Sequence, residues 1–535
     1  MKTRKTLSKN NIQTLTSAPI VHWLFLILLI FSIGFRLSLL PSLYRLDDGD
    51  TARDYLIARH IVVHHEFPTI GPNNAIYESV RASPLYFYLL AIPVLVQDSV
   101  YSIGVFNILL QALSVVLLYT LAYTLFGQST AILTAILLLF NQELFSQSFY
   151  MIQAHFGHVF FNGSYVFLAY SYIKKSYVSM CASAFLFALG CIVSFHGFPA
   201  LLGYLVISFW ILRAQKTPLK QIFTLFGVMA LLGLFFYAPM LIKMVQTGHG
   251  LFLVREPVYI TSFANFPLRV LANILLAMDD WVRSLWFSPI LKNTILGLLG
   301  FILLHHTITN KQKTSLYVKI IALYVLQIAF LAAILRIETN SYQYDAATGL
   351  LLILLAFAAS AAWPKNIYGR VGSWITAVCV IFLVIPTRGY IQWQITQSGQ
   401  QTSLQNRMSP LYTYLDQQKR INPTSWNSDF QIVVYNGHAN MYHWKESVIW
   451  NALEHKYAMP FIRVTNTGYG YAPITTREQK YIIICEEYIS IDDATNRCIP
   501  SFTQSQQGVP YFIRLLSDNS PIGYILFSAE LDEAK

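Results

Sequence analysis

Four aspartates lie close together in the stretch that follows the first apolar run of this chain. Asp47, Asp48, Asp50 and Asp54 all fall within Tyr44–Leu90, in a chain of which only 12% of the residues are charged. A carboxylate beside a bilayer can act as a general base that removes a proton from an attacking hydroxyl. A neighbouring carboxylate raises the pKa of the first one or helps it to hold a divalent cation. The cluster therefore predicts an active site in this loop.

The same aspartates also suit a purely structural role. Asp47 and Asp48 stand where the expected helix Asp50–His65 begins, so they are good candidates for an N-cap and for favourable interaction with the helix dipole. Tyr55 and Ala58 fall at helical spacing, which predicts an amphipathic helix on the membrane surface. We favour the catalytic interpretation because further carboxylates follow the pair and because membrane-bound substrates arrive at this surface.

Histidines occur in two patterns that invite comparison with metal or cavity sites. His60 and His64 share one face of the expected helix, a spacing that suits zinc, but the Glu of a zinc-protease motif is missing. We assign no metal centre here and interpret both as surface histidines. His155, His158 and Asn162 interrupt an apolar stretch, and polar groups at membrane depth usually face protein or water. We expect them to line a cavity.

The composition is that of a polytopic membrane protein. The chain has 535 residues, of which 55% are hydrophobic, and a mean hydropathy of +0.47. Repeated apolar runs are long enough to cross a hydrocarbon core of about 30 Å. Much of the net charge of +11 lies in short loops between these runs, where the positive-inside rule places Lys and Arg. We therefore infer no nucleic-acid partner, and expect contact with membrane lipid.

Apolar segments expected to form helices lie at about 20–40, 84–97, 101–126, 129–149, 155–173, 177–195, 197–212, 221–245, 288–308, 316–335, 344–363 and 371–387. The placement of Lys and Arg predicts a cytoplasmic N-terminus, a first external loop at 41–83, a second at 246–287, and an external segment after residue 388. The first half does not fit this topology. Four segments lie between 84 and 173, whereas an odd number of spans is needed to lead from the outside to the inside. We expect 11–13 spans in total.

Residues 389–535 are polar and are expected to form a soluble extracytoplasmic α/β domain. Short β-type runs lie at 431–435, 481–485 and 523–527, and a helix is expected at about 441–455. Cys485 and Cys498 lie in this region, where a disulfide is possible outside the cytoplasm but is not determined by the sequence.

Three segments resemble the GT-C superfamily of membrane glycosyltransferases, in the branch of protein O-mannosyltransferases and lipid A aminoarabinose transferases. They are LDDGDTARDYLIARHI at 46–61, FPTIGP at 67–72 and SPLYFYLLA at 83–91. The plan of an acidic first external loop, about a dozen spans and an external C-terminal domain is similar too. The resemblance implies a transmembrane glycosyltransferase domain at 1–388.

The resemblance also implies a reaction. Such enzymes move a sugar from a polyprenyl-phosphate donor to an acceptor outside the membrane, which here would be a lipid, a glycan or a protein. Asp47 would be the general base and Asp48 would support it. In this family the second residue of the acidic pair is usually Glu, and the residue after the following Gly is usually Arg. Here these two positions are Asp48 and Asp50. Asp50 is therefore a further catalytic candidate, and Mg²⁺ or Mn²⁺ at Asp47 and Asp48 stays an open alternative.

The donor phosphate needs a cation. Arg81 stands just before SPLYFY, and an Arg fork suits a phosphate, with Glu78 one helical turn away. The other candidates for binding the donor phosphate are Arg255 in the second external loop, and Arg336 and Tyr344 in RIETNSYQYD.

Aromatic residues Tyr86, Phe87 and Tyr88 are expected to shape a groove for the donor lipid.

The alternative class is a non-enzymatic transporter or flippase of a lipid-linked saccharide. Transporters carry ionisable residues inside their spans and often contain internal repeats. Here the charges cluster in loops and no repeat is visible, which favours the enzyme.

Overall fold

The structure is a computed structural model. It describes residues 10–43, 49–63, 65, 67–69, 71, 83–149, 153–194, 197–247, 288–309, 313–334, 345–361, 367–399, 412–417, 419–421, 423, 430–436, 480–486, 491–500, 511–519 and 524–531, with some side chains within these ranges excepted, among them all those of 430–436. The chain divides into two compact units, residues 1–44 with 57–392 and residues 45–56 with 393–535.

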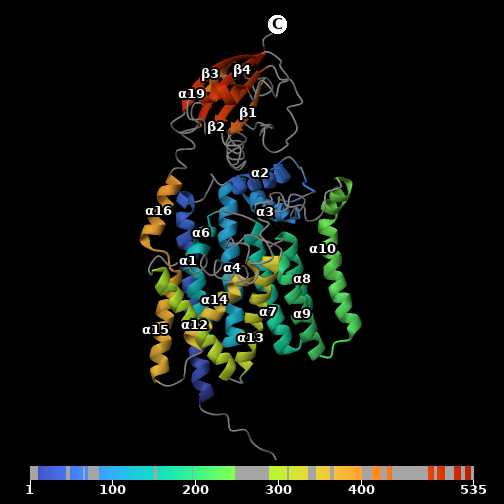
Figure 1. The fold of residues 1–535 in the computed structure, drawn as a ribbon, viewed down its shortest axis with the longest axis vertical. Coiled ribbons are helices and arrows are strands. Elements are labelled where there is room, and N and C mark those ends of the chain that lie inside the picture. Colours follow the sequence, from blue (N-terminus) through green and yellow to red (C-terminus); the bar gives the residue numbers. More distant parts are fainter. Residues whose placement is uncertain are drawn as a thin grey trace, which may run out of the picture. The chain divides into compact units, whose positions relative to one another are not determined.

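The first unit is a bundle of long apolar helices (Figure 1). The described helices from Asn10 to Gly399 are α1 (Asn10–Leu43), α2 (Gly49–Val63), α3 (Leu85–Val96), α4 (Val100–Phe126), α5 (Gln128–Leu139), α6 (Gln142–Gln147), α7 (Gln153–Lys174), α8 (Tyr177–Val193), α9 (Phe198–Ala214), α10 (Leu219–Thr247), α12 (Pro289–Thr309), α13 (Lys313–Ile334), α14 (Asp345–Ser360), α15 (Ile367–Val384) and α16 (Arg388–Gly399). These bounds agree closely with the expected apolar segments.

Five of the described helices are long and apolar enough to cross a membrane. They contain the segments Ile20–Pro41, Tyr101–Phe126, Leu219–Pro239, Ile290–Thr309 and Gly369–Gln392. Outward-facing apolar side chains such as Phe235 and Trp374 are about three-quarters exposed, as expected where lipid rather than water is the solvent. The chain is a polytopic helical membrane protein.

Two of the helices between residues 84 and 173 are short. α3 and α5 each have 12 residues, which gives a length of about 18 Å, and that is less than a hydrocarbon core of about 30 Å. Helix length alone therefore does not decide which of the four apolar segments fails to cross.

The segment expected as one helix at 129–149 is broken into α5 and α6. Asn141 is the N-cap of α6, since its side chain accepts a hydrogen bond from the Leu144 amide at 3.0 Å. A polar cap therefore ends one helix and starts the next inside the bundle.

The centre of the bundle is α14. Its residues Leu352–Ala359 are at most 7% exposed, and the helix packs on α5, α7, α13 and α15. A helix that is apolar all round is stable only when neighbours surround it, which explains why α14 reads as a continuous apolar run.

The second unit contains a four-stranded mixed sheet in the order β1-β2-β4-β3. Its strands are β1 (Phe430–Asn436), β2 (Lys480–Glu486), β3 (Tyr511–Asn519) and β4 (Tyr524–Leu531). β1 pairs with β2 in parallel, whereas β4 pairs antiparallel with both β2 and β3. The three strands expected from the sequence are present, and β3 is additional. The helix expected at 441–455 lies outside the described residues.

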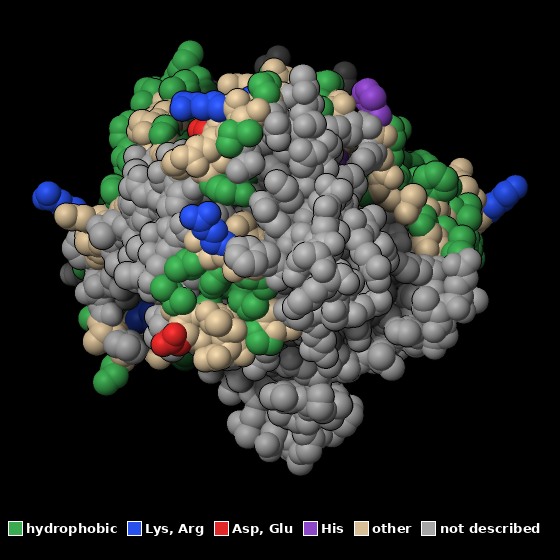
Figure 2. Space-filling view, turned by 90° about the horizontal axis from the view of Figure 1, so that it is seen from above, with side chains coloured by type: hydrophobic (Ala, Val, Ile, Leu, Met, Phe, Trp, Pro, Cys, Tyr) green, Lys and Arg blue, Asp and Glu red, His purple; other side chains and the backbone are tan. Residues whose placement is uncertain are grey.

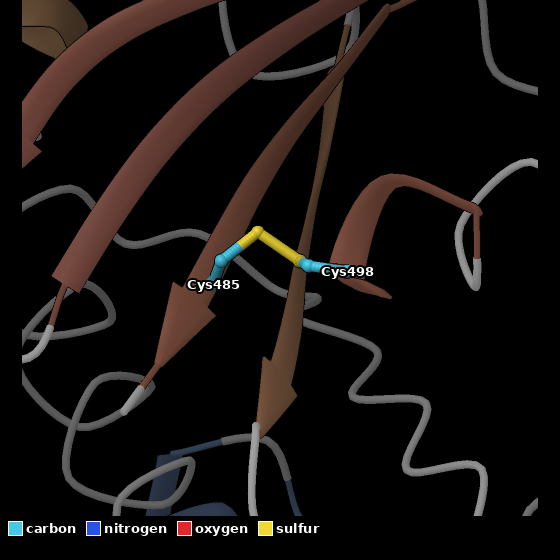
Figure 3. Close-up of a disulfide and its surroundings, with 2 residues drawn as sticks. All are labelled: Cys485 and Cys498. Carbon is cyan, nitrogen blue, oxygen red and sulfur yellow. A yellow bond between two sulfur atoms is a disulfide. The ribbon is translucent and has the colours of Figure 1, made fainter. Parts of the chain in front are cut away.

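Cys485 and Cys498 form a disulfide (Figure 3). It joins β2 to the short π-helical turn Ala494–Cys498, and both cysteines are fully buried beside Ile483, Phe527 and Ala529. The pairing that the sequence left undetermined is therefore present. In the first unit, Cys181, Cys191 and Cys379 are free thiols.

Candidate active site at the first-loop end of the bundle

Ring contacts bring the starts of three helices together. Phe156, near the start of α7, lies 5.5 Å from Tyr86 in α3 and 5.7 Å from Phe106 in α4, measured between ring centroids. Six residues after Phe156, the Asn162 amide donates to Ser114 Oγ at 2.5 Å. The N-terminal ends of α3, α4 and α7 therefore lie at the same end of the bundle.

The C-terminal end of α1 and the start of α14 lie there too. Phe35 stacks on Phe145 of α6 at 6.0 Å. Gly349, in the second turn of α14, packs against Leu118 and Asn162. We call this the first-loop end, because α1 ends there and the loop that carries Asp47 begins.

Contacts at the opposite end complete the pattern. Thr130 at the start of α5 lies 3.1 Å from Ser360 at the end of α14 (Oγ1 to Oγ), and Tyr172 at the end of α7 packs on Tyr317 at the start of α13. The Lys and Arg residues of the described helix ends and connections here include Lys174, Lys175, Arg213, Lys216, Lys220, Lys313 and Lys319. These basic connections thus lie at the end opposite to the one where α1 ends, as the charge pattern predicts.

The expected loop helix is α2, which begins at Gly49 and ends at Val63 rather than at His65. His65 has a φ of 56°, a left-handed conformation that stops a helix. Within α2, Asp54, Tyr55 and Ala58 are at most 2% exposed. The buried stripe confirms that α2 has two unlike faces.

An ion pair fixes the second half of α2 to the bundle. Arg59 Nε lies 3.0 Å from both carboxylate oxygens of Asp98, immediately before Ser99, the N-cap of α4. The pair is partly exposed. It ties α2, which contains Asp50 and Asp54, to the start of α4.

The FPTIGP segment is held against α3. The Tyr88 hydroxyl donates to the Pro68 carbonyl at 2.6 Å, and the rings of Phe67 and Tyr88 are 6.4 Å apart. Tyr86 and Phe87 are at most 2% exposed. Expecting them to line a lipid groove was wrong, because their rings are used in packing α3 onto the bundle.

The predicted catalytic and donor-binding side chains lie outside the described residues. Asp47 and Asp48 directly precede α2, and Asp50 is the second residue of α2, although its side chain is not described. The others are Glu78, Arg81, Arg255, Arg336 and Tyr344. In the view of Figure 2, the described charged side chains are few and isolated among hydrophobic groups. The described helices nevertheless bring the C-terminal end of α1 and the start of α14 to the same end of the bundle, and two of these segments are attached there.

A small polar cavity lies inside this end of the bundle. Its polar lining comes from α1, α4 and α7, and consists of Arg36, Gln111, Ser114, His158 and Asn162. We call it the Arg36 cavity. His158 and Asn162 line a cavity as the sequence predicted. The side chain of His155 is not described.

Sequence reasoning missed Arg36. This residue is 6% exposed and lies within the apolar segment Ile20–Pro41. A lone Arg inside a span is itself a signal of a polar environment. Among the described residues, no group of three or more His, Cys, Asp or Glu side chains is placed to hold a metal ion.

No protein-family model matches the chain, and no curated protein is significantly similar in sequence. The crystal structure of ArnT from Cupriavidus metallidurans in the apo state matches with a TM-score of 0.56 and 12% identity, over 96% of this chain and 98% of that one. The chain shares the fold of ArnT.

ArnT bound to undecaprenyl phosphate matches the same fold, with a TM-score of 0.52 and 10% identity over 96% of this chain and 98% of that one. A weaker likeness, with a TM-score of 0.44 and 13% identity, links the chain to the oligosaccharyltransferase of Archaeoglobus fulgidus, over 92% of this chain and 69% of that one. The likeness to ArnT covers residues of both units.

Proposed function

We propose that this protein is a membrane glycosyltransferase that moves a sugar from a polyprenyl-phosphate donor to an acceptor outside the membrane. The observation that carries the proposal is the acidic loop that directly follows α1, in a chain that shares the ArnT fold over 96% of its length. A crystal structure of that neighbour holds undecaprenyl phosphate, which supports a polyprenyl phosphate as the carrier.

In the proposed reaction, Asp47 removes the proton from an acceptor hydroxyl while its oxygen attacks the anomeric carbon of the sugar. The bond from that carbon to the phosphate oxygen breaks, and polyprenyl phosphate leaves. Asp48 and Asp50 support Asp47 or hold a divalent cation. Arg81 and Arg336 neutralise the charge that develops on the phosphate.

The helices of the described bundle support this assignment. Asp47 and Asp48 follow the end of α1 in the sequence, and α14 begins directly after the segment with Arg336 and Tyr344. Because α1 ends and α14 begins at the first-loop end, a base and a phosphate-binding group from distant parts of the sequence attach at one end of the bundle.

We further propose that the first-loop end faces the outside of a cell membrane and that the N-terminus is cytoplasmic. The basic connections at the opposite end support this orientation. The disulfide between Cys485 and Cys498 supports an oxidising compartment for the C-terminal unit.

The test is transfer from radiolabelled polyprenyl-phosphate sugars in membranes that carry the wild-type chain, Asp47→Asn or Asp48→Asn at equal abundance. A matched control is Asp492→Asn, because Asp492 is an exposed carboxylate of the C-terminal unit. We expect Asp47→Asn to reduce transfer at least 100-fold, in the range typical of a lost general base of about 10²–10⁴, and Asp492→Asn to leave it unchanged. Equal transfer by both acidic-loop variants and wild type would remove the catalytic role from this pair.

A further inference from the structure

Arg36 carries a positive charge inside the bundle that its described partners only partly balance. It donates to Ser32 Oγ, and its Nη2 donates to the Leu139 carbonyl at 3.0 Å. Leu139 is the last residue of α5, and the carbonyl end of a helix carries roughly half a negative charge. No carboxylate among the described residues pairs with Arg36, so about half a positive charge remains.

Two buried donors of the Arg36 cavity have no acceptor among the described residues. They are Arg36 Nε and Gln111 Nε2. The Gln111 side chain is oriented by Ser148, whose one hydroxyl proton is shared between Gln111 Oε1 at 2.7 Å and the Leu144 carbonyl at 2.9 Å, so that the amide nitrogen is left over. Leaving a buried donor without an acceptor costs about 1–3 kcal/mol.

A third donor faces the same group of residues. Ser114 Oγ accepts a hydrogen bond from Asn162 Nδ2 at 2.5 Å. Since a hydroxyl has one proton of its own, Ser114 can still donate. The lining therefore offers a guanidinium, an amide and a hydroxyl, and the described lining residues include no carboxylate.

The size of the cavity limits what can occupy it. Its volume is about 20 Å³, on a measure by which one water molecule needs roughly 10–15 Å³. That is room for a single atom of the size of water or a halide, whereas a phosphate group has five heavy atoms and does not fit.

We propose that the Arg36 cavity binds one monatomic anion of the halide class. A bound halide accepts from Arg36 Nε, Gln111 Nε2 and the Ser114 hydroxyl, and its negative charge is attracted by the positive charge that the end of α5 leaves uncompensated. A water molecule satisfies the hydrogen bonds but not the charge, and the positive charge of Arg36 repels a cation. The anion joins α1 to α4.

The first test is the unfolding temperature of the purified full-length protein in detergent, in sodium chloride or bromide against sodium gluconate at equal ionic strength. A ligand that binds only the folded state raises this temperature in a saturable manner. We expect a rise of at least about 2 °C in either halide for wild type. Identical curves in halide and gluconate would overturn the proposal.

Variants locate the effect. Gln111→Leu and Ser114→Ala each remove one donor and should weaken the halide response at least tenfold in the concentration that gives half the shift. The matched control is Ser208→Ala, because Ser208 is a fully buried serine on α9 outside the cavity lining, and it should keep the wild-type response. A response unchanged in the two cavity variants places the halide elsewhere and contradicts the proposal.

The second test does not depend on how well the variants fold. Crystals of the wild-type protein soaked in sodium bromide should give an anomalous peak between Arg36 and Gln111. A peak at this position supports the site directly, and anomalous maps without one would show that the cavity holds water only. Neither test uses transfer activity, so the proposal stands or falls separately from the proposed function.

Discussion

Arg59 and Asp98 form the ion pair that joins α2 to the start of α4, with Arg59 Nε 3.0 Å from each carboxylate oxygen of Asp98. The four aspartates of the acidic cluster precede Arg59 in the sequence. Asp98 directly precedes Ser99, the N-cap of α4. The pair is therefore placed to hold the acidic segment in position, and not to take part in chemistry.

Breaking this pair should reduce transfer without abolishing it. Partly exposed ion pairs contribute about 0.2–1 kcal/mol, so we expect Arg59→Gln and Asp98→Asn each to lower the transfer rate by up to about fivefold. The double variant should be no worse than either single variant, because the two act through one interaction. Additive losses in transfer assays would show that the two residues act independently.

A glycine in α9 should prove intolerant of a single added methyl group. A Cβ at Gly203 would lie 2.6 Å from Tyr324 Cδ2, and Tyr324 is held by hydrogen bonds to Tyr165 and to the Ala200 carbonyl. We expect Gly203→Ala to destabilise the bundle by about 1–3 kcal/mol, as overpacking does.

Gly227 in α10 provides the matched control for this substitution, because nothing lies within 4 Å of a Cβ built there. Gly227→Ala should be neutral or slightly stabilising in the same helical context. Unfolding of the two purified variants in detergent measures the difference. Equal unfolding temperatures would contradict the described packing of α9 on α13.

Removing the disulfide should destabilise the C-terminal unit selectively. Cys485 and Cys498 are separated by 13 residues in the sequence, and closing a loop of this size stabilises a fold by about 3 kcal/mol. We expect Cys485→Ser with Cys498→Ser to increase proteolysis of residues after 400 while the helical bundle stays intact. Cys379→Ser, which removes a free thiol, should leave the proteolysis pattern unchanged.

Thiol labelling of intact cells tests the same bond and its compartment. A membrane-impermeant maleimide should label Cys485 or Cys498 only after reduction from outside the cells. Labelling without prior reduction would contradict the disulfide, and labelling only after lysis would contradict the external position of this unit.

The bundle was largely predictable, because long apolar runs and alternating basic connections depend on local sequence. The break between α5 and α6 was missed, although Asn141 and Gln142 are a visible polar interruption of an apolar run. β3 was missed as well: Tyr511–Asn519 lacks the continuous apolar stretch by which the other strands were recognised.

The candidate site was less predictable for a physical reason. Asp47 and Asp48 are recognisable by residue type, but the Arg36 cavity depends on which helices pack together. Arg36 and Gln111 are far apart in the sequence, and only the packing of α1 on α4 brings them to one cavity. Likewise, no local pattern shows that Tyr86 and Phe87 pack inward.

The most direct test of the central claim asks whether the sugar leaves its carrier. Purified protein in liposomes would be given a polyprenyl-phosphate sugar labelled in both the sugar and the lipid, together with extracts containing acceptor. Our account predicts that wild type forms labelled polyprenyl phosphate without its sugar, in an amount equal to the labelled sugar that is transferred to acceptor. Asp47→Asn should form neither product. Intact labelled donor that merely changes leaflet would contradict the account and identify a flippase.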